Sequence, residues 1–133
     1  MGTVVLDASV LLGFLNPNDV LGDGCRTAIA EVRLRGDGFT LPASALAESL
    51  VHTARDRPDR LDDLIARIVG LFGGERVVDR HVAKAAAQLR AGHPTIRLPD
   101  ALVIATGVVD DAVVLTCDKR LAGVDPRVQV LGP

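Results

Sequence analysis

The segment TVVLDAS at residues 3–9 predicts how the chain begins to fold. Residues 3–6 are apolar or β-branched throughout, a pattern typical of a short buried strand. Asp7 follows at once, and an apolar helix then extends through Phe14 and stops near Asn16-Pro17. Asp7 is therefore expected at the carboxyl end of a buried strand.

The same alternation of strand and helix continues along the chain. Further strands are expected at residues 39–41, 76–78, 112–116 and 128–131, and further helices at residues 19–35, 42–55, 58–72, 80–90 and 99–109. Strands that alternate with helices predict a parallel sheet covered by helices. The expected fold class is α/β, with a central, mainly parallel sheet of four to five strands.

Two of the expected helices have informative apolar patterns. The helix at residues 42–55 has one apolar stripe, formed by Leu46, Ala47, Leu50, Val51 and Ala54. This stripe is expected to face the core, and Glu48 and His52 fall outside it. The helix at residues 99–109 is apolar on nearly every side, so it is expected to be buried.

Length and composition indicate one globular domain spanning residues 1–133, since 48% of the residues are hydrophobic and 24% are charged. The net charge is -2, so contact with nucleic acid must rely on a local basic patch. No long stretch lacks both charges and turn residues, and the amino terminus has no basic region before its apolar run. Neither a membrane span nor a secretory signal is expected, and the protein is predicted to be cytoplasmic.

Several site chemistries find no support in the sequence. Cys25 and Cys117 belong to no CxxC or Cys/His cluster, so both are expected to be reduced, without a zinc site or redox motif. His52, His81 and His93 share no pattern that suggests an acid and base pair for metal-free ribonuclease chemistry. The glycine-rich motifs of dinucleotide and P-loop sites are absent from the sequence, as is the GxSxG nucleophile elbow.

Four acidic residues stand out by their placement. Asp7 and Asp118 follow expected strands, Asp100 opens the buried helix, and Glu48 lies in the helix after the second strand. Taken singly, each has a structural explanation as a helix cap, a turn residue or a solvated helix residue. The carboxyl ends of parallel strands, however, line the functional crevice of an open sheet. Converging carboxylates repel one another unless a cation neutralises them, which favours a hard divalent ion such as Mg²⁺ or Mn²⁺.

Four short segments carry a resemblance to a known family. They are VVLDAS at residues 4–9, AE at 47–48, LPDA at 98–101 followed by Ile104-Ala105, and LTCD at 115–118. In this order and spacing, the chain resembles the PIN domain over nearly its whole length, and in particular the VapC-like toxins of bacterial toxin–antitoxin pairs. The resemblance implies a three-layer α/β/α PIN-like fold.

The resemblance also implies a function and a site. A metal-activated water would hydrolyse RNA phosphodiester bonds, so the expected activity is that of a Mg²⁺- or Mn²⁺-dependent endoribonuclease. The implied ligands of one or two metal ions are Asp7, Glu48, Asp100 and Asp118, with Ser9 and Thr116 in support. The candidate RNA contacts are Arg55, Arg97, Lys119 and Arg120. A cognate antitoxin and a homodimer are the implied protein partners.

Other interpretations stay open at this point. The same fold could be a catalytically silent binding module, or an RNA-processing nuclease that is not a toxin. A receiver-like signalling domain would need an acceptor Asp after a central strand, for which Val78-Asp79-Arg80 is the candidate segment. His52 lies one helical turn after Glu48, where it could either reach the acids or be a plain surface residue.

Overall fold

A five-stranded sheet forms the centre of the protein in the computed structural model, which describes residues 2–132. Its strand order is β3-β2-β1-β4-β5, and every neighbouring pair is parallel. The strands are β1 (Thr3–Leu6), β2 (Gly38–Pro42), β3 (Glu75–Arg76), β4 (Val113–Thr116) and β5 (Val128–Val130). The predicted parallel sheet is confirmed, with five strands in the described part of the chain.

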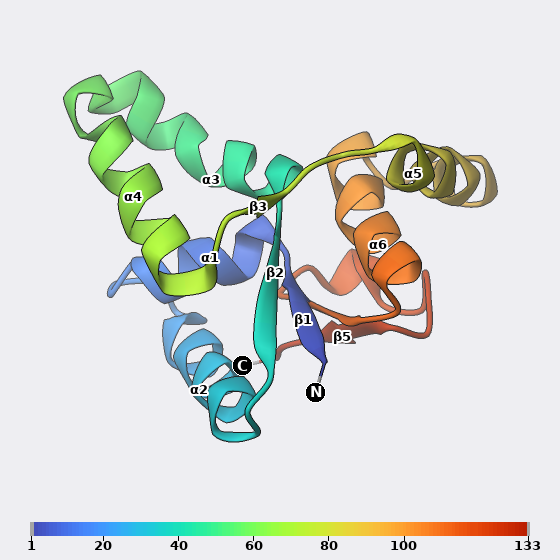
Figure 1. Ribbon diagram of the computed structural model, residues 1–133, viewed down its shortest axis with the longest axis horizontal. Coiled ribbons are helices and arrows are strands. Elements are labelled where there is room, and N and C mark those ends of the chain that lie inside the picture. Colours follow the sequence, from blue (N-terminus) through green and yellow to red (C-terminus); the bar gives the residue numbers. More distant parts are fainter. Residues whose placement is uncertain (1, 133) are drawn as a thin grey trace.

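Helices cover both faces of this sheet, so the predicted three-layer α/β/α arrangement is confirmed (Figure 1). They are α1 (Ala8–Leu15), α2 (Gly22–Leu34), α3 (Ala43–Asp56), α4 (Leu61–Phe72), α5 (Arg80–Gly92) and α6 (Leu98–Asp110), with short 3₁₀ turns η1 (Pro58–Arg60) and η2 (Lys119–Leu121). In Figure 1, α1, α2 and α4 lie on one side of the central strands and α5 and α6 on the other. Helix α3 contacts α1, α4 and α6.

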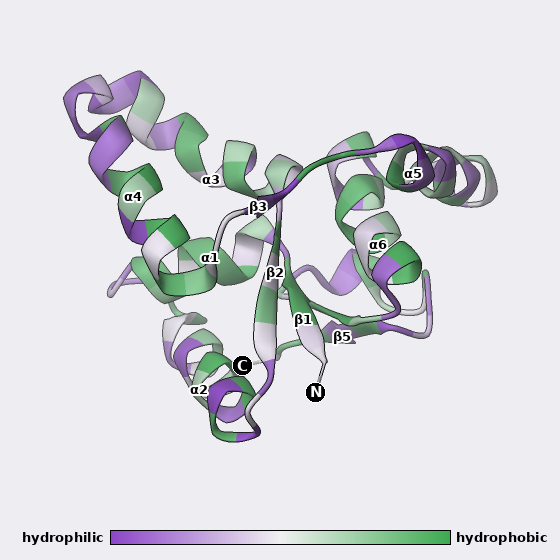
Figure 2. Cartoon of the chain, in the orientation of Figure 1, coloured by the Kyte–Doolittle hydropathy of each residue, from purple (hydrophilic) through white to green (hydrophobic). Residues whose placement is uncertain are grey.

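The core follows from the position of β1 at the centre of the sheet. Val4, Val5 and Leu6 are all buried, as expected for a parallel strand covered on both faces. Hydrophobic residues follow these central strands and their facing helices, whereas hydrophilic residues gather at the α3–α4 connection (Figure 2). Helix α6 lies against β4 at Gly107, where a Cβ atom would meet the Val114 side chain and lie 2.9 Å from the Ala112 carbonyl oxygen.

Some predicted boundaries were wrong. The strand expected at residues 76–78 is the two-residue β3, and Val77 and Val78 are exposed because the chain leaves the sheet there to reach α5. Helix α2 begins at Gly22, later than the expected residue 19. The delay has a local cause, since Asp19 Oδ1 accepts a hydrogen bond from the Leu21 amide and holds a turn.

The apolar stripe predicted for α3 was wrong in part. Leu46 and Leu50 pack against the core, but Ala47, Val51 and Ala54 are exposed. The buried positions are Ala45 and Ser49, and the Ser49 hydroxyl donates a hydrogen bond to the Ala45 carbonyl oxygen. Helix α3 therefore presents its small residues to its neighbours, a face that hydrophobic periodicity alone does not reveal.

None of the helices within residues 2–132 is long and apolar enough to cross a membrane.

Candidate active site

The ends of β1 and β4 place Asp7 and Asp118 in the same region of the sheet. These strands are parallel neighbours with Leu6 paired to Leu115, and the Asp7 amide donates a hydrogen bond to the Leu115 carbonyl oxygen at 3.0 Å. The segments that follow β1 and β4 therefore leave the sheet at the same edge, where the crevice of an open parallel sheet is expected.

The Asp7 carboxylate is buried and held by two hydroxyl groups. Ser9 Oγ and Thr116 Oγ each donate a hydrogen bond to Asp7 Oδ2 at 2.7 Å, and the residue is only 5% exposed. Asp7 occupies the N-cap position of α1, but its side chain makes no capping hydrogen bond. Among the hydrogen bonds of the described residues, none engages Oδ1. Helix capping therefore does not explain Asp7, and its second oxygen is free to bind another group.

The same two hydroxyls also fix the segment that follows β4. The Cys117 amide donates to Ser9 Oγ at 2.9 Å, and the Asp118 amide donates to Thr116 Oγ at 3.0 Å. Each hydroxyl thus accepts one amide proton and donates its own proton to Asp7. The residues predicted to support the site, Ser9 and Thr116, join the two strand ends through Asp7.

Asp100 lies in the first turn of α6 and is 4% exposed. Its two carboxylate oxygens accept hydrogen bonds from Arg97, with Nε at 3.2 Å from Oδ2 and Nη2 at 3.4 Å from Oδ1. Arg97 immediately precedes α6, so the pair is local in sequence. The guanidinium compensates for the burial of the charge, which would otherwise be costly.

Glu48 lies on α3, and its side chain is 33% exposed. Arg97 Nη2 is 4.0 Å from Glu48 Oε2, so one guanidinium lies between Glu48 and Asp100. Burial raises the pKa of Glu48, Arg97 opposes this effect, and the negative charges of Asp100 and Asp7 add to it. The charged form of Glu48 is therefore disfavoured by two of the other predicted acids.

Asp118 precedes η2 and is held by Arg120. Its Oδ1 accepts the Arg120 amide proton at 3.0 Å, and Arg120 Nη2 lies 2.6 Å from Oδ2. The hydrogen bonds from the Arg120 side chain lower the pKa of Asp118, and the charge of Arg97 adds to this effect. Asp118 therefore holds the turn after β4, and it also forms an ion pair with Arg120.

Arg97 is paired with Asp100 and lies close to Glu48, and Arg120 is paired with Asp118, so two guanidiniums face three of the four predicted acids. Within residues 2–132, no three Asp, Glu, His or Cys side chains already surround a single metal position. The donors are nevertheless all oxygens, the type preferred by Mg²⁺ and Mn²⁺. The free Oδ1 of Asp7 fits this chemistry, provided that the arginines release the other carboxylates.

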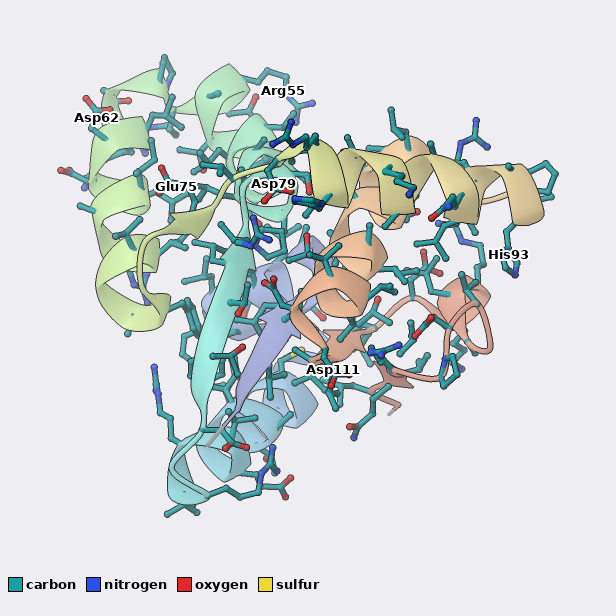
Figure 3. All side chains as sticks on the ribbon, turned by 45° about the vertical axis from the view of Figure 1, so that its right-hand side comes forward. Arg55, Asp62, Glu75, Asp79, His93 and Asp111 are labelled. Atoms are coloured by element: carbon teal, nitrogen blue, oxygen red, sulfur yellow. The ribbon has the colours of Figure 1, made fainter. Side chains whose placement is uncertain are left out.

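The candidate RNA contacts have different surroundings in the structure. Arg97 and Arg120 bind the acids directly, whereas Lys119 is exposed on η2. Arg55 lies on the outer part of α3 (Figure 3). Its guanidinium contacts Asp56 and His52 Nδ1. His52 Nε2 in turn lies 3.1 Å from Asp56, so this histidine belongs to a surface network and not to the acids.

The Asp79 of the receiver-like alternative has a structural role. It follows the edge strand β3, caps α5 by accepting the Val82 amide proton at 2.9 Å, and lies 3.0 Å from Arg76 Nη1. Figure 3 shows it at the start of α5. These contacts lower its pKa, and no central strand leads to it. The geometry required for a phosphoacceptor is therefore not met at Asp79.

Two features escaped the sequence analysis. One is a groove of about 620 Å³ between α1, α3 and α4, lined by Leu12, Leu15, Asn16, Pro17, Asp19, Ser49, His52, Thr53, Leu64 and Arg67. The other is a contact of 3.5 Å between the sulfur atoms of Cys25 and Cys117. The separate positions of these cysteines in the sequence gave no signal that they meet.

The family model described as the PIN domain matches residues 4–126. The search of curated proteins gave no match.

Solved structures are similar over most of the chain. A toxin–antitoxin complex from Klebsiella pneumoniae is 16% identical, with a TM-score of 0.74 and coverage of 98% of each chain. VapBC2 from Rickettsia felis, bound to a DNA fragment from its promoter, is 11% identical, with a TM-score of 0.77 and coverage of 98% of this chain and 97% of that chain. FitAcB from Neisseria gonorrhoeae is 25% identical, with a TM-score of 0.70 and coverage of 87% and 88%.

Proposed function

The chain belongs to the PIN domain family, and from this membership and the acidic site we propose that it is a Mg²⁺- or Mn²⁺-dependent endoribonuclease. The observation that carries the proposal is the Asp7 carboxylate, which is buried at the end of the central strand with one oxygen fixed and the other free. A carboxylate held in this way is preorganised to bind a cation, since little side-chain freedom remains to be lost.

We propose that Asp7, Glu48, Asp100 and Asp118 hold the metal. When bound, the ion supplies a water molecule of lowered pKa and neutralises the charge that builds on the phosphoryl group. Ser9 and Thr116 keep Asp7 oriented, and Thr116 also positions the Asp118 amide. The charged form of Glu48 is disfavoured by burial and by Asp100 and Asp7, so a nearby cation would stabilise this charged form most.

Arg97 and Arg120 are proposed to serve both the acids and the RNA. In this structure their guanidiniums neutralise Asp100, Glu48 and Asp118. With the carboxylates held by a divalent ion, the two guanidiniums would be free to bind the phosphate groups of the RNA. Arginine binds phosphate oxygens in a bidentate manner, so the released side chains are suited to hold the RNA backbone.

The structural neighbours support a biological role as well. They include proteins crystallised in toxin–antitoxin complexes, one of them with promoter DNA. We propose that the chain is the toxin of such a pair, acts on cytoplasmic RNA as a homodimer, and is silenced by a cognate antitoxin. The groove between α1, α3 and α4 offers apolar side chains such as Leu12 and Leu64 near the cationic Arg67, which suits a peptide segment of the antitoxin.

A catalytically silent module is the alternative, and the ion pairs of Arg97 and Arg120 with the acids favour it. An RNA cleavage assay distinguishes the nuclease from the silent module. Total RNA is incubated with the protein in Mg²⁺, Mn²⁺ or chelator, and the products are resolved for the wild type and for Asp7→Asn. Asp62→Asn, which changes an acid of α4 outside the site, is the matched control.

The nuclease proposal expects cleavage by the wild type and by Asp62→Asn in either metal, no cleavage in chelator, and a loss of at least about a hundredfold in Asp7→Asn. Equal activity in Asp7→Asn and the wild type would refute the assigned site. Absence of metal-dependent cleavage in all three proteins would support the silent module.

A further inference from the structure

The thiols of Cys25 and Cys117 meet beside the acidic site. Their sulfur atoms lie 3.5 Å apart although the residues are separated by 92 positions in the chain, and both cysteines are free. Cys25 lies on α2, whereas Cys117 directly follows β4. The contact therefore joins a helix of one outer layer to the segment that carries Asp118.

The position of the Cys25 sulfur is restricted by its surroundings. Cys25 is fully buried, and a Cβ atom at Gly13 of α1 would lie only 2.6 Å from its sulfur. The lack of a side chain at Gly13 thus creates the space that the sulfur occupies. With α1 behind it, the Cys25 thiol faces Cys117, and the two sulfurs stay close without a covalent bond.

Cys117 is also connected to the proposed catalytic carboxylate. Its amide donates a hydrogen bond to Ser9 Oγ at 2.9 Å, and that hydroxyl donates to Asp7 Oδ2 at 2.7 Å. Thr116 and Asp118, which flank Cys117, belong to the same site. A displacement of the Cys117 backbone would therefore change the support of Asp7 and the position of Asp118 together.

We propose that Cys25 and Cys117 are a site of reversible oxidation, at which a disulfide forms and displaces the segment after β4, so that the acidic site loses affinity for its metal. This inference rests on the function proposed above for the metal site. The oxidant is hydrogen peroxide. The thiolate of one cysteine, whose proton has gone to solvent, attacks the O–O bond of the peroxide, becomes a sulfenic acid and releases water once the leaving hydroxide takes up a proton. The second thiol then attacks the sulfenic sulfur and displaces a second water to form the S–S bond. Two thiols lose two electrons and two protons, and the peroxide is reduced to two waters.

The expected direction of the effect follows from the geometry. A disulfide requires a sulfur separation of about 2.05 Å, so the two sulfurs must approach by roughly 1.5 Å. Cys25 lies within a packed helix pair, whereas Cys117 is only half-buried and lies in the turn between β4 and η2. Peroxide reaches Cys117 first, and the turn is the part that moves. Loss of the contacts that orient metal ligands typically weakens metal binding by about 10- to 100-fold.

The test compares reduced, peroxide-treated and re-reduced protein. Intact mass measures the loss of two hydrogens, and hydrogen exchange measures the protection of the Cys117 amide. Calorimetry with Mn²⁺ alone measures metal affinity. Cys25→Ala is the matched control, because it removes the disulfide without changing a residue of the acidic site, and Cys25→Ser replaces it should the alanine variant fail to fold.

We expect the oxidised wild type to lose two hydrogens, to exchange the Cys117 amide faster and to bind Mn²⁺ at least about tenfold more weakly, with recovery in dithiothreitol. Neither Cys25 variant should show these changes. A gain of oxygen without loss of hydrogen would overturn the proposal, as would a disulfide that leaves exchange and affinity unchanged. If the reduced protein neither binds Mn²⁺ nor cleaves RNA, the proposed function fails, while mass and exchange still decide whether oxidation displaces this segment.

Discussion

The hydroxyl of Thr116 donates a hydrogen bond to the Oδ2 atom of Asp7 at 2.7 Å, and it thereby joins the ends of β4 and β1 across 109 positions of the chain. Thr116 is fully buried and Asp7 almost so. A buried hydrogen bond to a charged acceptor is among the stronger ones in proteins, and a donor lost from such a pair leaves the carboxylate poorly compensated.

Thr116→Val removes the hydroxyl and keeps the shape of the side chain. The expected loss is about 1.5–3 kcal/mol in the free energy of unfolding, because Asp7 stays buried with one donor fewer. Urea denaturation checks this value, and Mn²⁺ binding is expected to weaken in parallel. Thr116→Ser keeps the hydroxyl, so it should retain metal affinity, and a valine variant that binds Mn²⁺ as the wild type does would contradict the role given to Thr116.

Arg120→Gln removes the cation that holds Asp118. The pKa of Asp118, now lowered by Arg120, should return toward its ordinary value, and the freed carboxylate should bind Mn²⁺ several-fold more tightly in the absence of RNA. RNA binding should weaken, with a salt dependence that is less steep by about 0.7–0.9 in the logarithmic plot. Arg127→Gln is the control, because Arg127 pairs with Asp111 at the far end of α6. Unchanged metal affinity in Arg120→Gln would refute the competition between Arg120 and the metal.

Glu48→Gln tests the charge repulsion within the site. Burial, together with the charges of Asp100 and Asp7, raises the pKa of Glu48 in the folded protein. The stability associated with protonated Glu48 is therefore present at low pH and is lost as the pH rises through the folded-state pKa. In chelator at pH 7 the variant should therefore have a Tm higher by roughly 1–3 °C, a small effect since the side chain is partly screened by water. The gain should vanish near pH 4.

Thermal unfolding at the two pH values measures this difference, and Mn²⁺ provides a second comparison. With excess Mn²⁺ the order should reverse, because the metal stabilises the wild type and the variant has lost a ligand. A Tm below that of the wild type in chelator at pH 7 would show that Glu48 is not under electrostatic strain.

Gly107→Ala tests the contact between α6 and β4. The added methyl group would meet the Val114 side chain and the Ala112 carbonyl oxygen, so we expect a loss of about 1–3 kcal/mol in the free energy of unfolding. Gly70→Ala is the matched substitution in α4, where a Cβ atom meets nothing within 4 Å, and it should gain up to about 1 kcal/mol from helix propensity. Urea denaturation of both variants checks the opposite signs, and equal effects would mean that α6 does not approach the sheet as described.

The order of the elements and the parallel sheet could be predicted from local patterns in the sequence. Apolar residues are continuous at positions 4–6 and 112–115, which is the pattern of strands buried on both faces, and the intervening helices have their own periodicity. Asp7 and Asp118 could be assigned to the same edge for the same reason, because parallel strands end at a common edge. Local patterns predict the type and order of these elements, because helix and strand formation depends largely on residues that are close in the sequence.

The contacts between groups that are distant in the sequence could not be predicted in the same way. The approach of Cys25 to Cys117, the placement of Arg97 between Glu48 and Asp100, and the small-residue face of α3 all depend on how separate elements pack. Such contacts arise from distances and orientations between helices and strands that no local periodicity encodes. For this reason the predicted stripe of α3 was partly wrong, and the thiol contact beside Asp118 was not anticipated.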